Sequence, residues 1–233
     1  MRFHALACDY DGTIATEGRV PPKVVEALEQ LKRSGRALVL VSGRTHDEWI
    51  RRFPGATLFD RVILENGAVL FRPETGELRA LAPAPPAEFA RALRERGVRP
   101  LAQGKVIVAT VRPHETTVQG VIRDLGLDMD VIFNKGAVMA LPSGVNKASG
   151  LAVALEELGL SPHNVVGVGD AENDQAFLEH CEFAVAVANA LPSLKEKVDW
   201  ITRAAEGEGV AEIAALLVEN DFRDAEPRHP RHG

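Results

Sequence analysis

The stretch FHALACDYDGT, from Phe3 to Thr13, places two carboxylates directly after a short apolar run. In an extended chain, residues two apart point to the same side, so Asp9 and Asp11 face one spot where the predicted strand ends. Two carboxylates this close are stable when a cation lies between them or when one of them holds a proton. Asp and Gly also favour turns, and this pair alone would support no more than a turn.

Apolar runs and amphipathic helical stretches alternate on both sides of this segment. A helical pattern over 22–34 leads to an apolar run over Ala37–Val41, and another apolar run, Val165–Val168, precedes a helical stretch over 173–180. This βα alternation is typical of a parallel sheet covered by helices. We therefore expect an α/β fold with a Rossmann-like parallel-sheet core.

Proline-rich and glycine-containing breaks divide the chain. The run Pro83-Ala84-Pro85-Pro86 interrupts both helix and strand patterns, and Pro142-Ser143-Gly144 closes the segment that follows it. Between them the pattern is helix, strand, helix and two strands, which predicts a small α+β insert. We expect a core at 1–82 and 143–218, a cap domain at 83–142, and a polar, disordered tail at 219–233.

The composition excludes several classes of partner. The net charge is −6 and the chain has two cysteines, without the spacing of a zinc site. An acidic chain lacks the basic surface that nucleic acid or an anionic membrane requires, and the N-terminal apolar run is too short to span a membrane. We expect a cytoplasmic protein, a monomer or homodimer, that binds a small molecule and holds any anionic ligand through a metal or a few placed cations.

Two further segments carry groups suited to anions. Ser42, Gly43 and Arg44 follow an apolar strand and precede a helix, so that a hydroxyl, an unhindered backbone and free helix N–H groups meet there. Ser42 would serve equally well as a simple helix N-cap. Lys147 begins another predicted helix, where its charge opposes the helix dipole unless an anion binds beside it. An exposed, solvated lysine is the alternative.

The segment Gly167–Asp174 joins a fully apolar strand to a helix. Asp170 ends the strand and Asp174 lies one helical turn further on, so both carboxylates can face one site. Mg²⁺ prefers oxygen ligands from one or two carboxylates plus water and substrate. Asp170 is the stronger candidate for a ligand, and Asn173 and Asp174 for supporting positions. Acidic residues that stabilise a helix N-terminus are the alternative explanation.

Taken together and in order, these four segments resemble the motifs of haloacid dehalogenase-like phosphatases. The matching residues are Asp9-Tyr10-Asp11-Gly12-Thr13, Ser42-Gly43-Arg44, Asn146-Lys147 and Gly169-Asp170-Ala171-Glu172-Asn173-Asp174. Three more stretches resemble subfamily IIB, which includes Cof-like proteins: Glu65-Asn66-Gly67-Ala68, Leu141–Lys147 and Ala188-Asn189-Ala190. The short insert is similar in size to the cap of archaeal phosphoglycolate phosphatases.

The resemblance implies roles for these residues. Asp9 would be the nucleophile, and Asp11 the general acid that later activates water. Mg²⁺ would be held by the carboxylates of Asp9 and Asp170 and by the backbone carbonyl of Asp11. The phosphate-binding positions implied are Ser42, Gly43 and Lys147, those for substrate are Arg44 and Asn66, and those that orient metal-bound water are Asn173 and Asp174.

The implied activity is hydrolysis of a small phosphorylated metabolite, phosphoglycolate or a sugar phosphate. A phosphomutase would use the same aspartyl-phosphate, although related mutases have larger caps. A non-catalytic phosphate-binding module is the third hypothesis, and the intact Asp9 and Asp11 pair argues against it.

Overall fold

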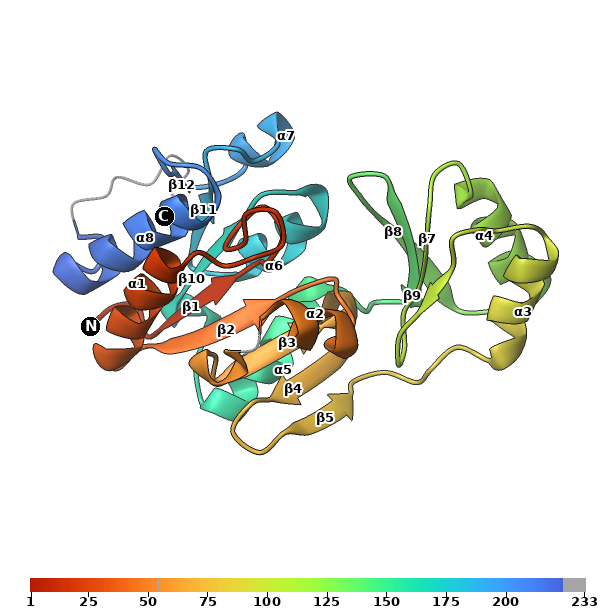
Figure 1. Cartoon of the computed structure of the whole chain (residues 1–233), viewed down its shortest axis with the longest axis horizontal. Helices are drawn as coiled ribbons and strands as arrows, with labels where there is room; N and C mark the ends of the chain where they lie inside the picture. The colour runs from red at the N-terminus through yellow and green to blue at the C-terminus, as the bar shows by residue number, and fades with distance from the viewer. Residues whose placement is uncertain (54, 224–233) are drawn as a thin grey trace.

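The computed structural model describes residues 1–53 and 55–223 and contains two separate sheets (Figure 1). The larger has eight strands in the order β12-β11-β10-β1-β2-β3-β4-β5. Its strands are β1 (Ala5–Cys8), β2 (Ala37–Val41), β3 (Arg61–Leu64), β4 (Val69–Arg72), β5 (Glu77–Ala80), β10 (Val165–Gly169), β11 (Phe183–Ala186) and β12 (Trp200–Ile201). Its helices are α1 (Pro22–Arg33), α2 (His46–Arg52), α5 (Lys147–Leu158), α6 (Gln175–His180), α7 (Pro192–Lys195) and α8 (Glu206–Glu219).

The centre of this sheet is parallel, as predicted. β1 pairs in parallel with β2 on one side and with β10 on the other, and all four of its residues are buried. The connection from β1 to β2 runs one way along the sheet and that from β10 to β11 the other way. Right-handed crossovers therefore place α1 and α6 on opposite faces, where α1 packs with α8 and α6 with α5. The predicted α/β core is confirmed.

Two short features of this core escaped the sequence patterns. β12 has only two residues, too few for any alternation, and the first turn of α8, from Glu206, contains two glycines, which are weak helix formers. β4 and β5 form a hairpin that pairs antiparallel at the edge of the sheet. None of these differences changes the carboxyl edge of the parallel strands.

The insert forms the second sheet, which is antiparallel, with the order β6-β7-β9-β8. Its elements are α3 (Ala87–Glu95), β6 (Ala102–Gln103), β7 (Val108–Val111), α4 (Glu115–Asp124), β8 (Met129–Asn134) and β9 (Ala137–Pro142). Successive side chains of β9 point to opposite faces of this second sheet. Val138 and Ala140 pack under α3 and α4, whereas Met139 and Leu141 belong to the apolar cluster of the core. We propose that 83–142 act as one cap on the core.

One buried carboxylate fastens the cap segment to the core. Glu65 lies in a short 3₁₀ turn after β3, is 2 % exposed and accepts hydrogen bonds from the backbone N–H groups of Lys105, Val106 and Ile107 at 2.8, 2.8 and 2.9 Å. A Cβ at Gly104 would lie 2.4 Å from this carboxyl group, so only glycine permits the approach. These bonds hold the start of the cap sheet against the sheet of the core.

The predicted disorder of the tail is wrong for residues 219–223. α8 ends at Glu219, but Phe222 is 2 % exposed and packs against Phe3 and Phe183, with ring centroids 6.3 and 4.9 Å away. The carboxylate of Asp221 accepts from the Arg36 guanidinium at 2.9 Å. One aromatic ring and one ion pair are enough to order a segment that is otherwise polar. Residues 224–233, where the prediction also applied, lie outside the described residues.

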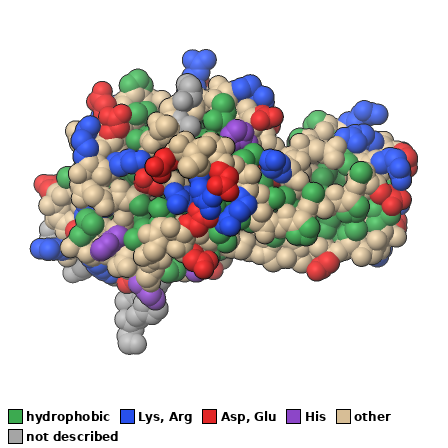
Figure 2. Space-filling model, turned by 90° about the horizontal axis from the view of Figure 1, so that it is seen from below, with side chains coloured by type: hydrophobic (Ala, Val, Ile, Leu, Met, Phe, Trp, Pro, Cys, Tyr) green, Lys and Arg blue, Asp and Glu red, His purple; other side chains and the backbone are tan. Residues whose placement is uncertain are grey.

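The surface bears both signs of charge. Figure 2, a view from below, shows basic and acidic side chains interspersed on the core and no continuous basic stripe on this face. Within the described residues, no helix is both long enough and apolar enough to cross a membrane. Neither finding conflicts with the small-molecule partner expected from the composition.

Glu157 on α5 binds three arginines at the antiparallel edge of the core. Its carboxylate accepts from Arg61, Arg72 and Arg79 at 2.8, 2.6 and 2.8 Å. The Arg72 hydrogen bond above all lowers the pKa of Glu157 to about 2, from an ordinary value of 4.5. The carboxylate thus links the helix to β3, β4 and β5.

Replacing Glu157 by Gln is expected to lower the free energy of unfolding at pH 7 by about 1 to 2 kcal/mol, a value reduced for solvent screening at this edge. Because the folded pKa lies below the unfolded one, the contribution is complete above pH 4.5 and is lost as the pH falls towards 2. Urea unfolding at several pH values measures this. Glu156→Gln, at the exposed neighbouring position, is the control. A difference between wild type and Glu157→Gln that does not shrink at low pH would contradict the prediction.

Candidate functional site

The candidate residues meet at the carboxyl edge of the parallel strands. Asp9 follows β1, Ser42 follows β2 and Asp170 follows β10. The chain leaves β1 towards one side of the sheet and β10 towards the other, so a crevice opens between these two strands, where ligands bind in open α/β sheets. The fold itself thus brings together motifs that are up to 161 residues apart, from Asp9 to Asp170.

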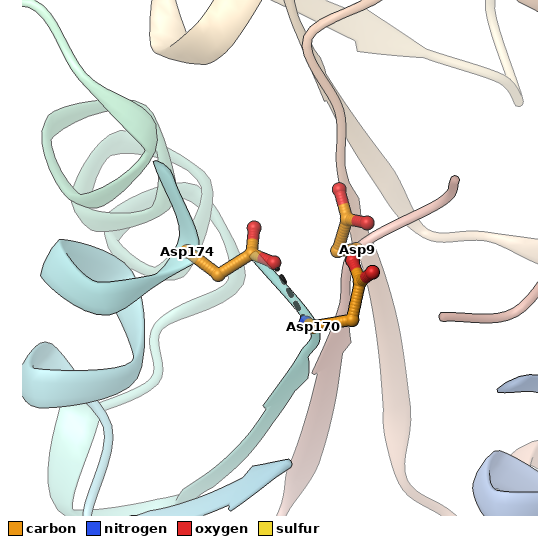
Figure 3. Close-up of side chains that lie close together, drawn as sticks. All are labelled: Asp9, Asp170 and Asp174. Carbon is orange, nitrogen blue, oxygen red and sulfur yellow. Dashed lines mark hydrogen bonds between the residues drawn. The ribbon is translucent and has the colours of Figure 1, made fainter. Parts of the chain in front are cut away.

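Three carboxylates and one ammonium form the centre of the site. Oxygens of Asp9, Asp170 and Asp174 lie within 4.8 Å of one another, and all three residues are buried (Figure 3). Lys147, 1 % exposed, donates to Asp9 Oδ1 at 2.5 Å and to Asp174 Oδ1 at 2.6 Å. The alternative of an exposed lysine is therefore wrong, because Lys147 is the buried counterion of this cluster.

The electrostatics of the cluster favour a further cation. Burial raises the pKa of Asp9, with a further increase from the Asp174 carboxylate, while Lys147 opposes both. Burial alone would lower the pKa of Lys147, but the carboxylates of Asp174 and Asp9 outweigh it and raise that pKa above its ordinary value. One ammonium thus serves two buried carboxylates, and the third, Asp170, is paired with the half-exposed Lys135. A cation bound among them would relieve the repulsion that remains.

The donor set fits Mg²⁺. The ligands are hard carboxylate oxygens without sulfur or imidazole, which suits this ion better than a softer one. Both oxygens of Asp174 already accept bonds: Oδ1 from Lys147, and Oδ2 from the N–H groups of Asp170 and Ala171 at 2.8 and 2.9 Å. Both oxygens of Asp170 also accept bonds, Oδ1 from the Thr13 hydroxyl at 3.3 Å and Oδ2 from Lys135, so hydrogen bonding alone does not choose among the three carboxylates. We propose Asp9 and Asp170 as the ligands, while Asp174 orients both Lys147 and the loop that presents Asp170.

Asp11 is not part of this cluster of three carboxylates, and its side chain is 43% exposed. Its oxygens accept from Nε and Nη2 of Arg44 at 2.6 and 2.5 Å, a bidentate pair at the mouth of the site. The sequence suggested that Arg44 binds substrate, whereas in the structure its guanidinium is engaged by Asp11. Arg44 is therefore placed to position Asp11.

The amide of Asn66 links three parts of the site. Asn66 is fully buried with a left-handed backbone (φ 53°), accepts from Asn173 Nδ2 at 3.0 Å and contacts Met139 Sδ of the cap at 3.1 Å. A Cβ at Gly43 would lie 3.2 Å from Asn66 Oδ1, so Gly43 leaves the room that this amide occupies. Ser42 is buried beside them at 1 % exposure.

A cavity of about 240 Å³ lies between this group and the cap. Its lining includes Asn66, Lys147 and Asn173 from the core and Asp130 and Ile132 from β8. Asn173 Oδ1 faces no hydrogen-bond partner within the described residues. A buried polar oxygen without a partner normally signals a missing water or ligand, so this cavity is suited to hold one.

Two residues of the site were missed by the sequence patterns. Lys135, at the tip of the turn between β8 and β9, donates to Asp170 Oδ2 at 2.5 Å. Glu65, whose carboxylate holds the cap segment on the core, was indicated only as part of the stretch Glu65-Asn66-Gly67-Ala68 that resembles subfamily IIB. A lysine before a glycine between two predicted strands was the available signal for Lys135, but nothing in the pattern indicates which part of the core such a turn touches.

A family comparison agrees with this geometry. The model of haloacid dehalogenase-like hydrolases matches residues 6–95 and 136–213, which together include Asp9, Ser42, Lys147 and Asp170. The chain belongs to this family. Residues 96–135, between the matched segments, lie within the cap, so the family match rests chiefly on the core and its carboxyl edge.

Curated relatives in this hydrolase family are similar over most of their length. A protein named phosphoglycolate phosphatase from Methanothermobacter thermautotrophicus is 35% identical over 225 residues, covering 90% of this chain and 96% of the relative. A protein of the same name from Methanoculleus marisnigri is 31% identical over 222 residues, with coverage of 89% and 93%.

Solved structures share the fold of this haloacid dehalogenase-like chain. A Thermoplasma acidophilum protein superposes with a TM-score of 0.80 at 17% identity, over 94% of this chain and 99% of the other. A sugar phosphatase of haloacid dehalogenase subclass IIB superposes with a TM-score of 0.71 at 20% identity, over 91% and 97%. Both superpositions extend across the core and the cap.

Proposed function

We propose that this hydrolase is a magnesium-dependent phosphomonoesterase that acts on a small phosphorylated metabolite through an aspartyl-phosphate on Asp9. The observation that supports this most is the contact of Lys147 with Asp9 inside a buried carboxylate cluster at the edge of the sheet. Lys147 aligns Asp9 and offers its remaining donor capacity to a phosphoryl oxygen. Phosphoglycolate is the favoured substrate, on the names of the relatives that match the whole chain.

The proposed reaction begins with Asp9. Its carboxylate attacks phosphorus, the ester bond breaks, and Asp11 gives a proton to the departing oxygen. Both Asp11 oxygens accept hydrogen bonds from Arg44 in this structure. Asp11 therefore has to break these bonds before it can reach the leaving oxygen. Asp11, now ionised, then takes a proton from a water that attacks the phospho-aspartate, which releases phosphate and restores Asp9.

The other site residues act by position and charge. Lys147, the Ser42 hydroxyl and the Gly43 backbone would surround the transferring phosphoryl group, where most of the catalysis in such reactions is electrostatic. A Mg²⁺ held by Asp9 and Asp170 would neutralise charge on the phosphoryl oxygens. The cap excludes water from the reacting groups. We also propose a cytoplasmic location, as expected for a chain of this length with two cysteines, Cys8 and Cys181, both buried.

Removal of the metal is the first test of the proposal. Phosphate release from a panel of phosphorylated metabolites is expected with Mg²⁺ and is expected to fall at least about 100-fold with a chelator, since the ion neutralises developing charge. Added Mg²⁺ in excess of the chelator should restore the rate. Turnover that is equally fast with the chelator would contradict the metal dependence.

The same panel separates the alternatives. Isomerisation of a sugar phosphate without release of phosphate would favour a phosphomutase, and binding of phosphate esters without turnover would favour a binding module. The small cap and the intact pair of Asp9 and Asp11 lead us to expect hydrolysis.

A further inference from the structure

The cap places one cation inside the active site. β8 and β9 are joined by the two-residue turn Lys135-Gly136, in which φ is 44° and 88°. Two positive φ angles in succession are typical of the tight hairpin turn of type I′, whose first central position usually holds Asn, Asp or Gly. A lysine there occupies a conformation that costs backbone energy, and such departures gather at functional sites.

The Lys135 ammonium reaches the centre of the carboxylate cluster. It donates to Asp170 Oδ2 at 2.5 Å and lies 3.0 Å from where a Cβ of Gly12 would be. The absent side chain of Gly12 therefore leaves room for it. Glu65 holds the beginning of the cap sheet on the core, and β7 and β8 both pair with β9, so the hairpin tip is fixed over the site by the same sheet.

Lys135 is more exposed than the other two cations of the site, Lys147 and Arg44. Lys147 is shared by Asp9 and Asp174, and Arg44 is engaged by both oxygens of Asp11. The side chain of Lys135 is 48% exposed, against 1% for Lys147. Among the described cap residues, Lys135 is the cation that contacts the cluster, while the acidic Asp130 lines the cavity beside Lys147. If a Mg²⁺ binds Asp170, the ammonium gives up this contact and remains beside the phosphoryl site.

The in-line geometry of phosphoryl transfer indicates which part of the substrate would lie beside Lys135. In phosphoryl transfer the attacking and leaving oxygens are roughly in line, so a leaving group opposite Asp9 extends from the core towards the cap. The turn at Lys135 comes from that side. A metal ion and Lys147 would already neutralise the phosphoryl group, which leaves the cap ammonium for a second negative charge on the substrate.

We infer that Lys135 is a specificity-determining residue that binds a carboxylate on the leaving group, so that the preferred substrates are phosphate monoesters of small hydroxy acids. This inference rests on the proposed function. Phosphate esters of neutral alcohols of the same size would lack the carboxylate that Lys135 binds. They would be hydrolysed less well for that reason alone.

The test compares two esters of equal length in the Lys135→Met variant. Because a hydrogen bond to a charged group contributes about 1.5 to 3 kcal/mol, kcat/KM for 2-phosphoglycolate is expected to fall roughly 10- to 100-fold. For 2-hydroxyethyl phosphate, which has a hydroxyl in place of the carboxylate, the expected fall is under about threefold. Lys135→Arg should recover part of the preference. Arg123→Met, at a cap position on α4 whose side chain is 82% exposed, should change neither value.

Binding gives a readout that does not depend on turnover. In an Asp9→Asn background, calorimetry with 2-phosphoglycolate is expected to show a loss of affinity on adding Lys135→Met, and with 2-hydroxyethyl phosphate almost none. Equal losses for both esters, or no loss for either, would overturn the inference. If the wild type hydrolyses neither ester, phosphoglycolate is not the substrate, whereas release of phosphate from no member of the panel contradicts the proposed function itself. In both cases the calorimetric comparison still decides whether Lys135 recognises the carboxylate.

Discussion

Asp9→Asn is expected to abolish phosphate release, lowering kcat by about 10⁴-fold or more, because an amide cannot form the covalent intermediate. The substitution keeps the shape of a side chain that is 5 % exposed, so the loss would report chemistry more than packing. It also removes one of the two candidate Mg²⁺ ligands. Steady-state phosphate release at saturating Mg²⁺ measures the effect, and a thermal unfolding curve checks that the variant is folded.

Asp47→Asn is the matched control for this substitution. Its side chain on α2 is 85% exposed, and the same chemical change there should leave kcat within about twofold. Phosphate release by Asp9→Asn at more than about a hundredth of the wild-type rate would rule out Asp9 as the nucleophile.

Lys147→Met is expected to have the second-largest effect and to act in two ways. It removes the ammonium proposed to hold a phosphoryl oxygen, and this loss is expected to lower kcat/KM by about 10³-fold. It also leaves Asp9 and Asp174 buried without their counterion, which lowers the free energy of unfolding of the metal-free protein by about 3 to 5 kcal/mol. Methionine fills a similar volume, so lost packing contributes little to either change.

Mg²⁺ distinguishes the electrostatic cause of this instability from a packing defect. An ion that binds only the folded cluster stabilises it by mass action, so added Mg²⁺ should raise the stability of Lys147→Met in urea unfolding. Lys23→Met, whose side chain on α1 is 77% exposed, is the control and should unfold like the wild type. Activity within tenfold of wild type would contradict the role of Lys147, and unchanged stability without metal would contradict its role as counterion.

The core of the site could be predicted because its residues are tied to local signals. Asp9, Ser42 and Asp170 each follow an apolar strand, and Lys147 begins a helix. Parallel strands end at one edge, so locating the strands also located the side chains. The sequence patterns could not show that Lys147 is buried between two carboxylates, since charge and helix position alone are equally compatible with an exposed lysine.

The contributions of the cap could not be predicted in the same way. Lys135 and Glu65 act across the contact between the two sheets, and no sequence pattern determines how one sheet lies on another. The pairing of Arg44 with Asp11 is similar, because it depends on side-chain directions at the end of two strands. At the carboxyl end of the chain, a single buried ring at Phe222 outweighed a polar composition that predicted disorder.

The most direct test of the aspartyl-phosphate is to trap it. Wild-type protein mixed with Mg²⁺ and a ³²P-labelled ester, quenched in acid within milliseconds and digested, should carry label on the peptide that contains Asp9. The label should be removed by hydroxylamine, as an acyl phosphate is, and should accumulate in Asp11→Asn, where no base activates the hydrolytic water. Label on another residue, or efficient single-turnover release of phosphate without any labelled protein, would contradict the account.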